Sequence, residues 1–498
     1  MEKRKEIRLN AWSILLMISM GVIFYFFLGT WVSIEKDSVA YLYERGREGV
    51  LPGYPVFLEF FRSLLGEKNF LNGVVVAQGI LAIACTFSFV IVLQKQFYLR
   101  NCECILLYLF TMLPFSIYLP EVGITHQIMT EGITYAIFYL YYIMLLKAIW
   151  TCKYRWYAGS LVVAFVLALV RSQMLFLQAI CLLILLWIVY RRYSCKILKK
   201  VLVSCIALVI GMAMAFLSYK MVYKVVAYDN QKVFAKAQEE IQNSQIELNG
   251  SVEEHAQEAL EEIESGQTQL VQREVTSQFD SLIVSRGFFE ADREDVELFE
   301  DEMMRQIFLR SYELLDEDKH LYNYAEPGLY MWQDLVYDYL GLDVHQAIME
   351  YDAANPGVRM RSEASIFREL GLRVLFKHFG RYLYHAIRLM LPSFIASVFF
   401  QIRPIYLLCH FIALFIYLFA IIGSFWVKKN DGERRVIEYS LSIVLTMVIM
   451  VVVINLVFMG LQRYVVYGMG IFYCAMYLLV KEMYFVICKK LKYPIKSM

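Results

Sequence analysis

The feature that most constrains this chain is a series of apolar blocks, each long enough to cross a membrane. A helical span needs about 20 consecutive apolar residues. Hydrophobic residues make up 59% of the 498 residues and charged residues only 19%. We expect about ten spans, at residues 11–32, 71–93, 102–119, 131–150, 157–170, 174–190, 201–223, 404–427, 436–458 and 464–485. The fold class predicted is an all-α polytopic membrane protein.

Basic residues between the spans predict the orientation. Residues 1–9 are basic and lead into an apolar run without a small-residue cleavage site, so the first span is expected to remain as an anchor. Lys and Arg also gather after every second span and at residues 489–492, and such loops stay in the cytoplasm. The pattern predicts cytoplasmic N- and C-termini in a multi-pass protein of the cytoplasmic membrane.

Charge divides the chain into three parts. Residues 224–380 hold 32 acidic and 14 basic side chains, although the whole chain has a formal net charge of +1. We therefore expect an N-terminal transmembrane module (1–223), an acidic and mainly helical extracytoplasmic domain (224–380), and a C-terminal part with the remaining spans (381–498).

Two stretches are expected to lie on the membrane rather than across it. Residues 56–65 follow a Pro-Gly-Tyr-Pro turn and are too few to span, which favours a surface helix. Residues 381–400 mix tyrosines and basic residues with apolar ones, which is typical of an interfacial or re-entrant helix, and Pro392 is expected to break it.

Ionisable and polar residues at membrane depth are costly, so each is a functional candidate. On the predicted outer face, where the spans end, the candidates are Asp37, Glu121, His126, Glu131, Arg171, Arg463 and Tyr464. Acids and bases gathered on one face suit a reaction in which a carboxylate accepts a proton while cations hold an anionic leaving group. Transfer of a sugar from a lipid phosphate fits this description.

The order of these pieces resembles the GT-C fold glycosyltransferases, a membrane class that includes protein O-mannosyltransferases and lipid A aminoarabinose transferases. The matching features are Asp37 after the first span, the turn at 52–55, the Thr130-Glu131 pair, the turn at 170–173, and Gln462-Arg463-Tyr464 before the last span. The resemblance covers most of residues 1–223 and the last spans, but not the acidic domain. It departs at Ser38 and Ser172, where the class often has an acid and a proline.

The resemblance implies an inverting glycosyltransferase that takes its sugar from a polyprenyl-phosphate carrier. It makes Asp37 the general base, and Arg171 and Arg463 the cations that neutralise the phosphate of the departing carrier. It implies that His126 and Tyr464 add hydrogen bonds to phosphate or sugar.

For Glu121 and Glu131 the resemblance implies binding of sugar hydroxyls or of a divalent metal ion. Some members of the class require a metal and others do not, so a metal cofactor stays open. The expected partners are the polyprenyl-phosphate-linked sugar donor, membrane lipids and an envelope glycan, lipid or protein acceptor. No nucleic acid partner is expected.

Simpler interpretations of the same residues stay open. Asp37 and Glu131 could cap helices, Arg171 and Arg463 could extend their charges to the membrane interface, and His126 could be a satisfied loop residue. Two other function classes also remain. One is a polysaccharide polymerase or ligase of related architecture, and the other is a transporter or flippase of lipid-linked sugars. A non-enzymatic envelope scaffold is a third, although it would not need acids and arginines at one depth.

Overall fold

The computed structural model describes residues 9–28, 32–34, 38, 41–42, 51, 53–116, 123–192, 287–321, 340–357, 361–399, 406–430, 432–457 and 462–492. These residues are almost entirely helical, and no strand occurs among them. Their one β feature is an isolated bridge between Ser33 and Gln127. The expected all-α class is confirmed.

Six helices are long and apolar enough to cross a membrane: α4 (Phe70–Phe97), α6 (Thr130–Thr151), α8 (Phe176–Arg192), α17 (Tyr406–Lys429), α18 (Arg434–Val457) and α20 (Met469–Lys492). Three shorter apolar segments complete the described part of the bundle: α1 (Ala11–Val22) with η1 (Ile23–Phe27), α5 (Asn101–Met112) with η2 (Leu113–Ser116), and α7 (Tyr154–Val170). All nine overlap expected spans. The expected span at 201–223 lies outside the described residues.

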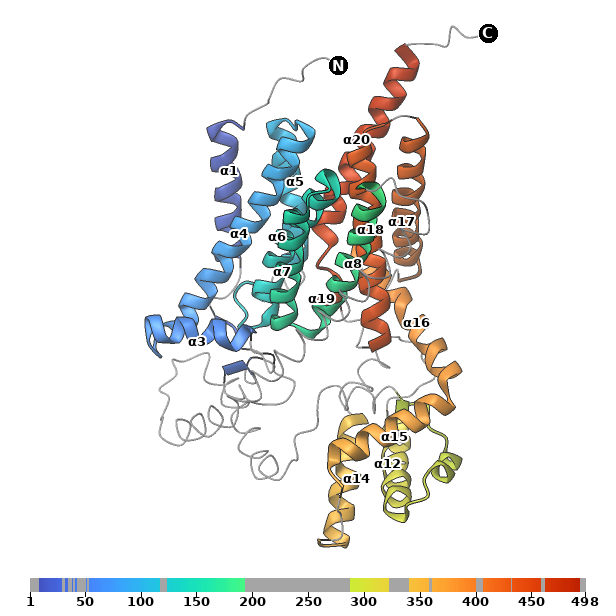
Figure 1. Ribbon diagram of the computed structural model, residues 1–498. Coiled ribbons are helices and arrows are strands. Elements are labelled where there is room, and N and C mark those ends of the chain that lie inside the picture. The colour runs from blue at the N-terminus through green and yellow to red at the C-terminus, as the bar shows by residue number, and fades with distance from the viewer. Residues whose placement is uncertain are drawn as a thin grey trace, which may run out of the picture.

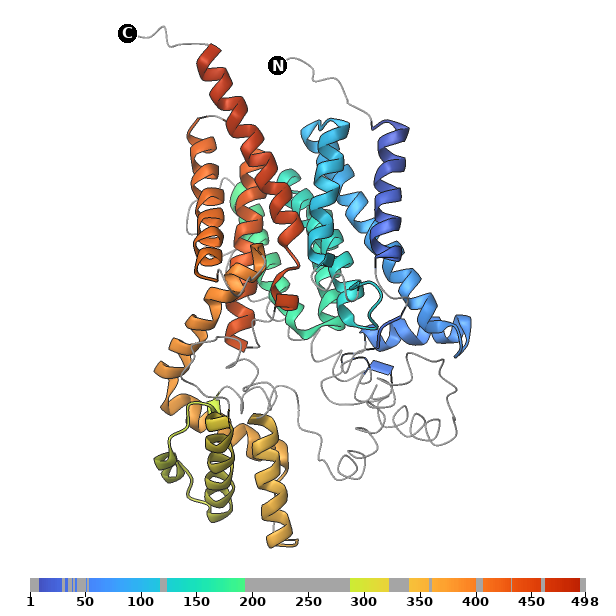
Figure 2. The same cartoon turned by 180° about the vertical axis from the view of Figure 1, so that it is seen from behind.

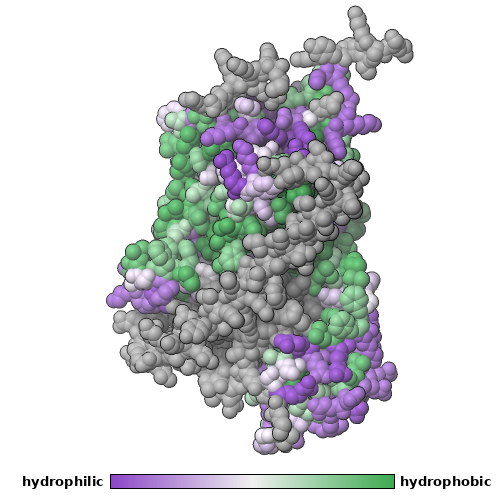
Figure 3. Space-filling view, viewed as in Figure 1, coloured by the Kyte–Doolittle hydropathy of each residue, from purple (hydrophilic) through white to green (hydrophobic). Residues whose placement is uncertain are grey.

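The helices form an upright bundle with a smaller helical domain at one end (Figure 1). The start of α1 and the end of α20 lie at the opposite end of the bundle from this domain, as the reverse view also shows (Figure 2). Apolar side chains cover much of the visible bundle surface, and polar side chains gather over its upper end and over the domain (Figure 3). A lipid-facing belt between two polar zones accounts for this distribution.

Helix α6 is the centre of the bundle. Apolar side chains are buried on all of its faces, as expected of a helix with neighbours on every side. Its aromatic residues also satisfy their hydroxyl groups there: Tyr139 donates to the carbonyl of Thr111 at 2.8 Å, and the hydroxyls of Tyr142 and Ser442 lie 2.8 Å apart. The packing of α6 therefore determines the position of its first turn, which lies at the domain-facing end of the bundle.

The end of the bundle near the domain carries a surface helix, α3 (Gly53–Leu65), as the sequence predicts. Its side chains Val56, Phe60 and Leu64 are exposed at a spacing of four residues, while Tyr54 and Leu58 are buried against the bundle. One apolar face thus packs on protein, and the exposed apolar stripe suits the membrane interface.

The domain has a core of its own. It comprises η4 (Arg293–Leu298), α12 (Glu302–Leu321), α14 (Leu340–Ala354) and α15 (Glu363–Lys377), and its buried centre includes Phe288, Phe308 and Ile366. Helix α15 ends at Lys377, and α16 (Phe379–Val398) starts after His378 and runs obliquely from the domain to α17 and α18 (Figures 1 and 2).

Pro392 does not break α16, contrary to expectation, because the helix continues through it to Val398. Contacts with α18 hold the helix on both sides of the proline: Tyr382 donates to the carbonyl of Leu456, and Ser393 donates to Asn455 at 3.1 Å. Tertiary packing therefore outweighs the lost backbone hydrogen bond. By length and composition α16 is not among the candidate spans, which agrees with an interfacial helix.

The last expected span divides in two. Residue Tyr464 belongs to the short helix α19 (Gln462–Val465), and α20 begins at Met469 after a turn. A β-carbon on Gly470 would lie 2.3 Å from the hydroxyl of Tyr139, so the chain approaches α6 closely at this point. Because of this break, α19 does not have to continue the axis of α20. Tyr464 lies near the start of α6.

Candidate functional site

A buried ion pair joins the first turn of α6 to the end of α7. Glu131 Oε1 lies 2.5 Å from Arg171 Nη1, and the two side chains are 1% and 10% exposed. Taking both charges out of water costs several kcal/mol per ion, which attraction and further hydrogen bonds must offset. Such pairs at the ends of membrane helices are candidates for function.

The local backbone places both charges. Helix α7 ends at Val170 because Arg171 is extended, with φ −148° and ψ 119°, and the 3₁₀ turn η3 (Ser172–Leu175) then redirects the chain into α8. Glu131 is the second residue of α6, where free N–H groups and the helix dipole favour a carboxylate. Glu131 therefore serves the helix and the ion pair together.

Three further contacts fix the pair. Thr130 Oγ1 donates to Glu131 Oε2 at 3.0 Å, and Arg171 Nε donates to Gln173 Oε1 at 3.2 Å. The guanidinium carbon of Arg171 lies 4.7 Å from the ring centre of Tyr464. Since a guanidinium over an aromatic face is attracted by it, α19 contributes to the site although it is distant in sequence.

The segment before Asp37 is bound to the segment before Glu131. The Ser33 amide donates to the carbonyl of His126 at 2.9 Å, and the Ile128 amide donates to the carbonyl of Ser33 at 3.0 Å. Past Asp37, the side chain of Ser38 is fully buried. Asp37 itself lies outside the described residues, but the chain is anchored on both sides of it.

A buried glutamine, which the sequence did not single out, organises this region. Gln78 of α4 accepts a hydrogen bond from Tyr54 at 2.9 Å and donates to the carbonyls of Thr125 and Gln127 at 2.9 and 3.0 Å. A β-carbon on Gly132 would lie 2.5 Å from the Gln78 carboxamide, so only glycine leaves room for it beside Glu131. The sequence feature that could have identified Gln78 is its position as a single glutamine within an apolar span.

His126 ties the same loop to the first helix. Its Nε2 and the hydroxyl of Thr125 each lie 3.0 Å from the carbonyl oxygen of Tyr25. A carbonyl can only accept, so Nε2 carries the hydrogen. Among the described residues, Nδ1 has no hydrogen-bond partner. The hydrogen bond to phosphate expected of His126 would therefore need a second hydrogen on Nδ1, which the neutral Nε2–H ring lacks.

The structure brings together Glu131, Arg171 and Tyr464 from the expected set, and it places His126 in the adjoining loop. Asp37 and Glu121 lie outside the described residues. Arg463 belongs to α19, but its side chain is outside the description. The convergence of three expected residues from distant segments supports a site at this end of the bundle.

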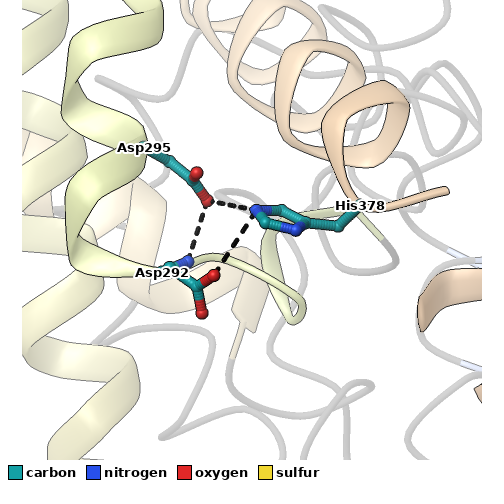
Figure 4. Close-up of side chains that lie close together, drawn as sticks. All are labelled: Asp292, Asp295 and His378. Atoms are coloured by element: carbon teal, nitrogen blue, oxygen red, sulfur yellow. Dashed lines mark hydrogen bonds and ion pairs between the residues drawn. The ribbon is translucent and has the colours of Figure 1, made fainter. Parts of the chain in front are cut away.

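The described residues hold one cluster with the spacing of metal ligands, and it lies in the domain rather than at the ion pair. The ligand atoms of Asp292, Asp295 and His378 lie within 4.8 Å of one another (Figure 4). Lys377 Nζ, however, lies 2.6 Å from Asp295 Oδ1, and Arg381 hydrogen bonds to both Asp292 and His378. Two cations already neutralise the two carboxylates, so this cluster does not fit a divalent ion.

The same contacts define the joint between the domain and α16. Because Arg381 can only donate, His378 Nδ1 must accept, and Nε2 carries the hydrogen toward Asp295 at 2.7 Å. Hydrogen bonds from Arg381 hold the pKa of Asp292 below its ordinary value. One turn after Arg381 in α16, His385 Nδ1 lies 2.5 Å from Glu290 Oε1. Ion pairs and hydrogen bonds between charged side chains therefore hold α16 to the domain.

No protein-family model matches this chain, and a search of curated proteins finds no match either.

Proposed function

We propose that this protein is an inverting glycosyltransferase of GT-C architecture that uses a polyprenyl-phosphate-linked sugar. The observation that supports it most is the convergence of Glu131, Arg171 and Tyr464 next to the loop that binds Ser33, four positions before Asp37. Asp37 lies four positions after Ser33, so their Cα atoms are at most about 14 Å apart. This chain length permits Asp37 to reach the loop that precedes Glu131.

In the proposed reaction a hydroxyl of the acceptor attacks the anomeric carbon of the donor sugar. Asp37 accepts the hydroxyl proton, the new glycosidic C–O bond forms, and the bond from the anomeric carbon to the phosphate oxygen breaks. The electron pair leaves with the polyprenyl phosphate. Attack from the opposite face inverts the configuration at the anomeric carbon.

Arg171 is the proposed phosphate ligand, and Glu131 positions it. With Nη1 on Glu131, Nε on Gln173 and its face over Tyr464, the guanidinium needs little reorganisation when the leaving group gains charge. Arg463 is proposed as a second cation, since it adjoins Tyr464 in α19. This geometry favours a positioning role for Glu131 over metal or sugar binding.

We further propose ten spans, cytoplasmic N- and C-termini and an outer face that carries both the site and the domain. The basic loops support this orientation. The acceptor is then an envelope glycan, lipid or protein outside the cytoplasmic membrane.

The test is a transfer assay with purified protein in lipid nanodiscs, a radiolabelled polyprenyl-phosphate hexose and delipidated envelope material as acceptor. We expect the wild type to label the acceptor and to release free polyprenyl phosphate, which mass spectrometry detects. Asp37→Asn should abolish both events at unchanged thermal stability. Wild-type turnover by Asp37→Asn would overturn the base assignment.

The lipid that is released in the assay distinguishes a glycosyltransferase from a polymerase or ligase and from a flippase. A polymerase or ligase would transfer a preformed chain from a pyrophosphate carrier, and a flippase would move the donor across the bilayer without releasing the carrier. Intact donor on the opposite leaflet, with no labelled acceptor, would refute the transferase proposal.

A further inference from the structure

Two basic side chains lie over one indole ring at the end of the bundle opposite the Glu131–Arg171 pair, and a third comes from the neighbouring helix α4. Lys147 Nζ lies 4.3 Å and the guanidinium carbon of Arg155 lies 5.2 Å from the ring centre of Trp156. Lys95 is exposed in the last turn of α4, which packs against α6. We name Lys95, Lys147 and Arg155 the basic trio.

The trio is built by three helices. Lys95 lies in the last turn of α4, Lys147 near the end of α6, and Arg155 in the first turn of α7. Proximity in sequence explains only part of this arrangement, because Lys95 comes from a separate span.

Two other basic residues at this end have acidic partners. Lys481 Nζ lies 2.6 Å from Glu103, and Arg191 Nη1 lies 2.9 Å from Glu438. Within the part of the chain that the structure describes, no member of the basic trio takes part in an ion pair. An indole ring attracts cations but carries no charge, so no described acidic residue compensates the mutual repulsion of the trio.

We propose that the basic trio and Trp156 bind the phosphate of an anionic phospholipid. A phosphodiester offers the negative charge that the trio lacks, and basic pockets between membrane helices at this level suit such headgroups. The indole suits the boundary between headgroups and acyl chains.

The surface below the trio favours a lipid over soluble phosphate. On α7, Ala158, Val162 and Val166 follow Arg155 at intervals of three to four residues and are exposed, with Val162 at 61%. This apolar stripe extends from the basic trio along the membrane-facing side of the helix. An acyl chain attached to the bound phosphate would lie along it, whereas inorganic phosphate would gain nothing from it.

The site also has a structural consequence. Helices α6 and α7 carry the lipid site at one end and Glu131 and Arg171 at the other. A phosphate between Lys147 and Arg155 would add a link between the two helices at a point where no described acidic side chain bridges them. Binding to the folded state alone should therefore raise thermal stability.

The experiment titrates delipidated protein in a non-ionic detergent with dioleoylphosphatidylglycerol, and it follows bound lipid by native mass spectrometry and stability by thermal unfolding. We expect the Lys147→Gln, Arg155→Gln double variant to lose about 25-fold in affinity, at about fivefold per charge. The single variant Lys95→Gln, at an exposed position, should lose about fivefold if the double variant fails to fold.

The control removes two charges elsewhere at the same end. Lys428 and Lys429 close α17, and the double variant Lys428→Gln, Lys429→Gln should keep wild-type lipid affinity. Equal losses in the control and trio variants would overturn the site in favour of general surface charge. Displacement of the lipid by 10 mM inorganic phosphate with no need for the acyl chains would overturn it in favour of soluble phosphate. None of these outcomes depends on glycosyl transfer.

Discussion

The phenol of Tyr54 donates a 2.9 Å hydrogen bond to the carboxamide oxygen of Gln78, and this contact joins the surface helix α3 to the span α4. The carboxamide nitrogen of Gln78 simultaneously holds two carbonyls of the loop before Glu131. One side chain thus connects three segments around the candidate site. Both hydrogens and the oxygen of its carboxamide have partners in a buried setting, where unsatisfied polar groups are costly.

Replacing Gln78 by Leu should destabilise the protein by about 1–3 kcal/mol, because two buried carbonyls and a phenol lose their partner. Tyr54→Phe is the matched control, since it removes only one of these hydrogen bonds and should cost about 1 kcal/mol. Thermal or denaturant unfolding in one detergent measures both. Equal stability of wild type and Gln78→Leu would show that the loop is held by other contacts.

Gly132→Ala should be destabilising by about 1–3 kcal/mol because its β-carbon would lie 2.5 Å from the Gln78 carboxamide. If this contact is the cause, truncation of Gln78 to Ala should relieve it. The double variant should then be less destabilised than the sum of the two single variants. Strict additivity in this cycle would mean that the space beside Glu131 does not depend on Gln78.

Removal of one partner from the Glu131–Arg171 pair should cost about 3–5 kcal/mol, because a buried charge is left alone. Glu131→Ala is therefore expected to unfold at lower temperature and to lose sugar transfer. Glu103 offers a control, since it is also buried and pairs with Lys481 at 2.6 Å at the other end of the bundle. Glu103→Ala should lose comparable stability but keep its transfer rate per folded molecule.

The sequence alone predicted the helical class and the overlap of nine spans with apolar helices, because helix length and apolar composition are local properties. It also predicted Glu131 and Arg171 as candidates, since charges stand out in apolar surroundings. It could not pair Gln78 with the loop at 125–127, because that contact depends on how distant helices pack. The prediction that Pro392 breaks its helix was wrong for the same reason, because packing on α18 maintains a helix that local propensity would end.

Arg381 should make the stability of the domain sensitive to acid. Its hydrogen bonds lower the pKa of Asp292 below the ordinary 3.8, so the stabilisation is present above that value and is lost as the pH falls through the folded-state pKa. Arg381→Gln should therefore be less stable than wild type at pH 7, and the difference should narrow toward pH 3. Asp292 is 49% exposed, so solvent screening keeps this effect small.

Thermal unfolding between pH 3 and pH 7 checks this prediction. Arg373→Gln is the control, because it removes the same charge from the domain but its partners are Glu369 and the carbonyl of Leu298. Its difference from wild type should not follow the titration of Asp292. A constant offset for Arg381→Gln across the pH range would contradict the assigned ion pair.

The two ends of the bundle should face opposite sides of the membrane. Cys102 is exposed at the start of α5, and Glu297 is exposed in η4 of the domain. In a background whose other cysteines are replaced, a membrane-impermeant maleimide should label Glu297→Cys in intact cells, whereas Cys102 should react only after permeabilisation. The basic loops at the Cys102 end are the physical reason, since they are retained in the cytoplasm. Reaction of Cys102 in intact cells, with Glu297→Cys protected, would invert the proposed topology and place the Glu131–Arg171 site on the cytoplasmic face.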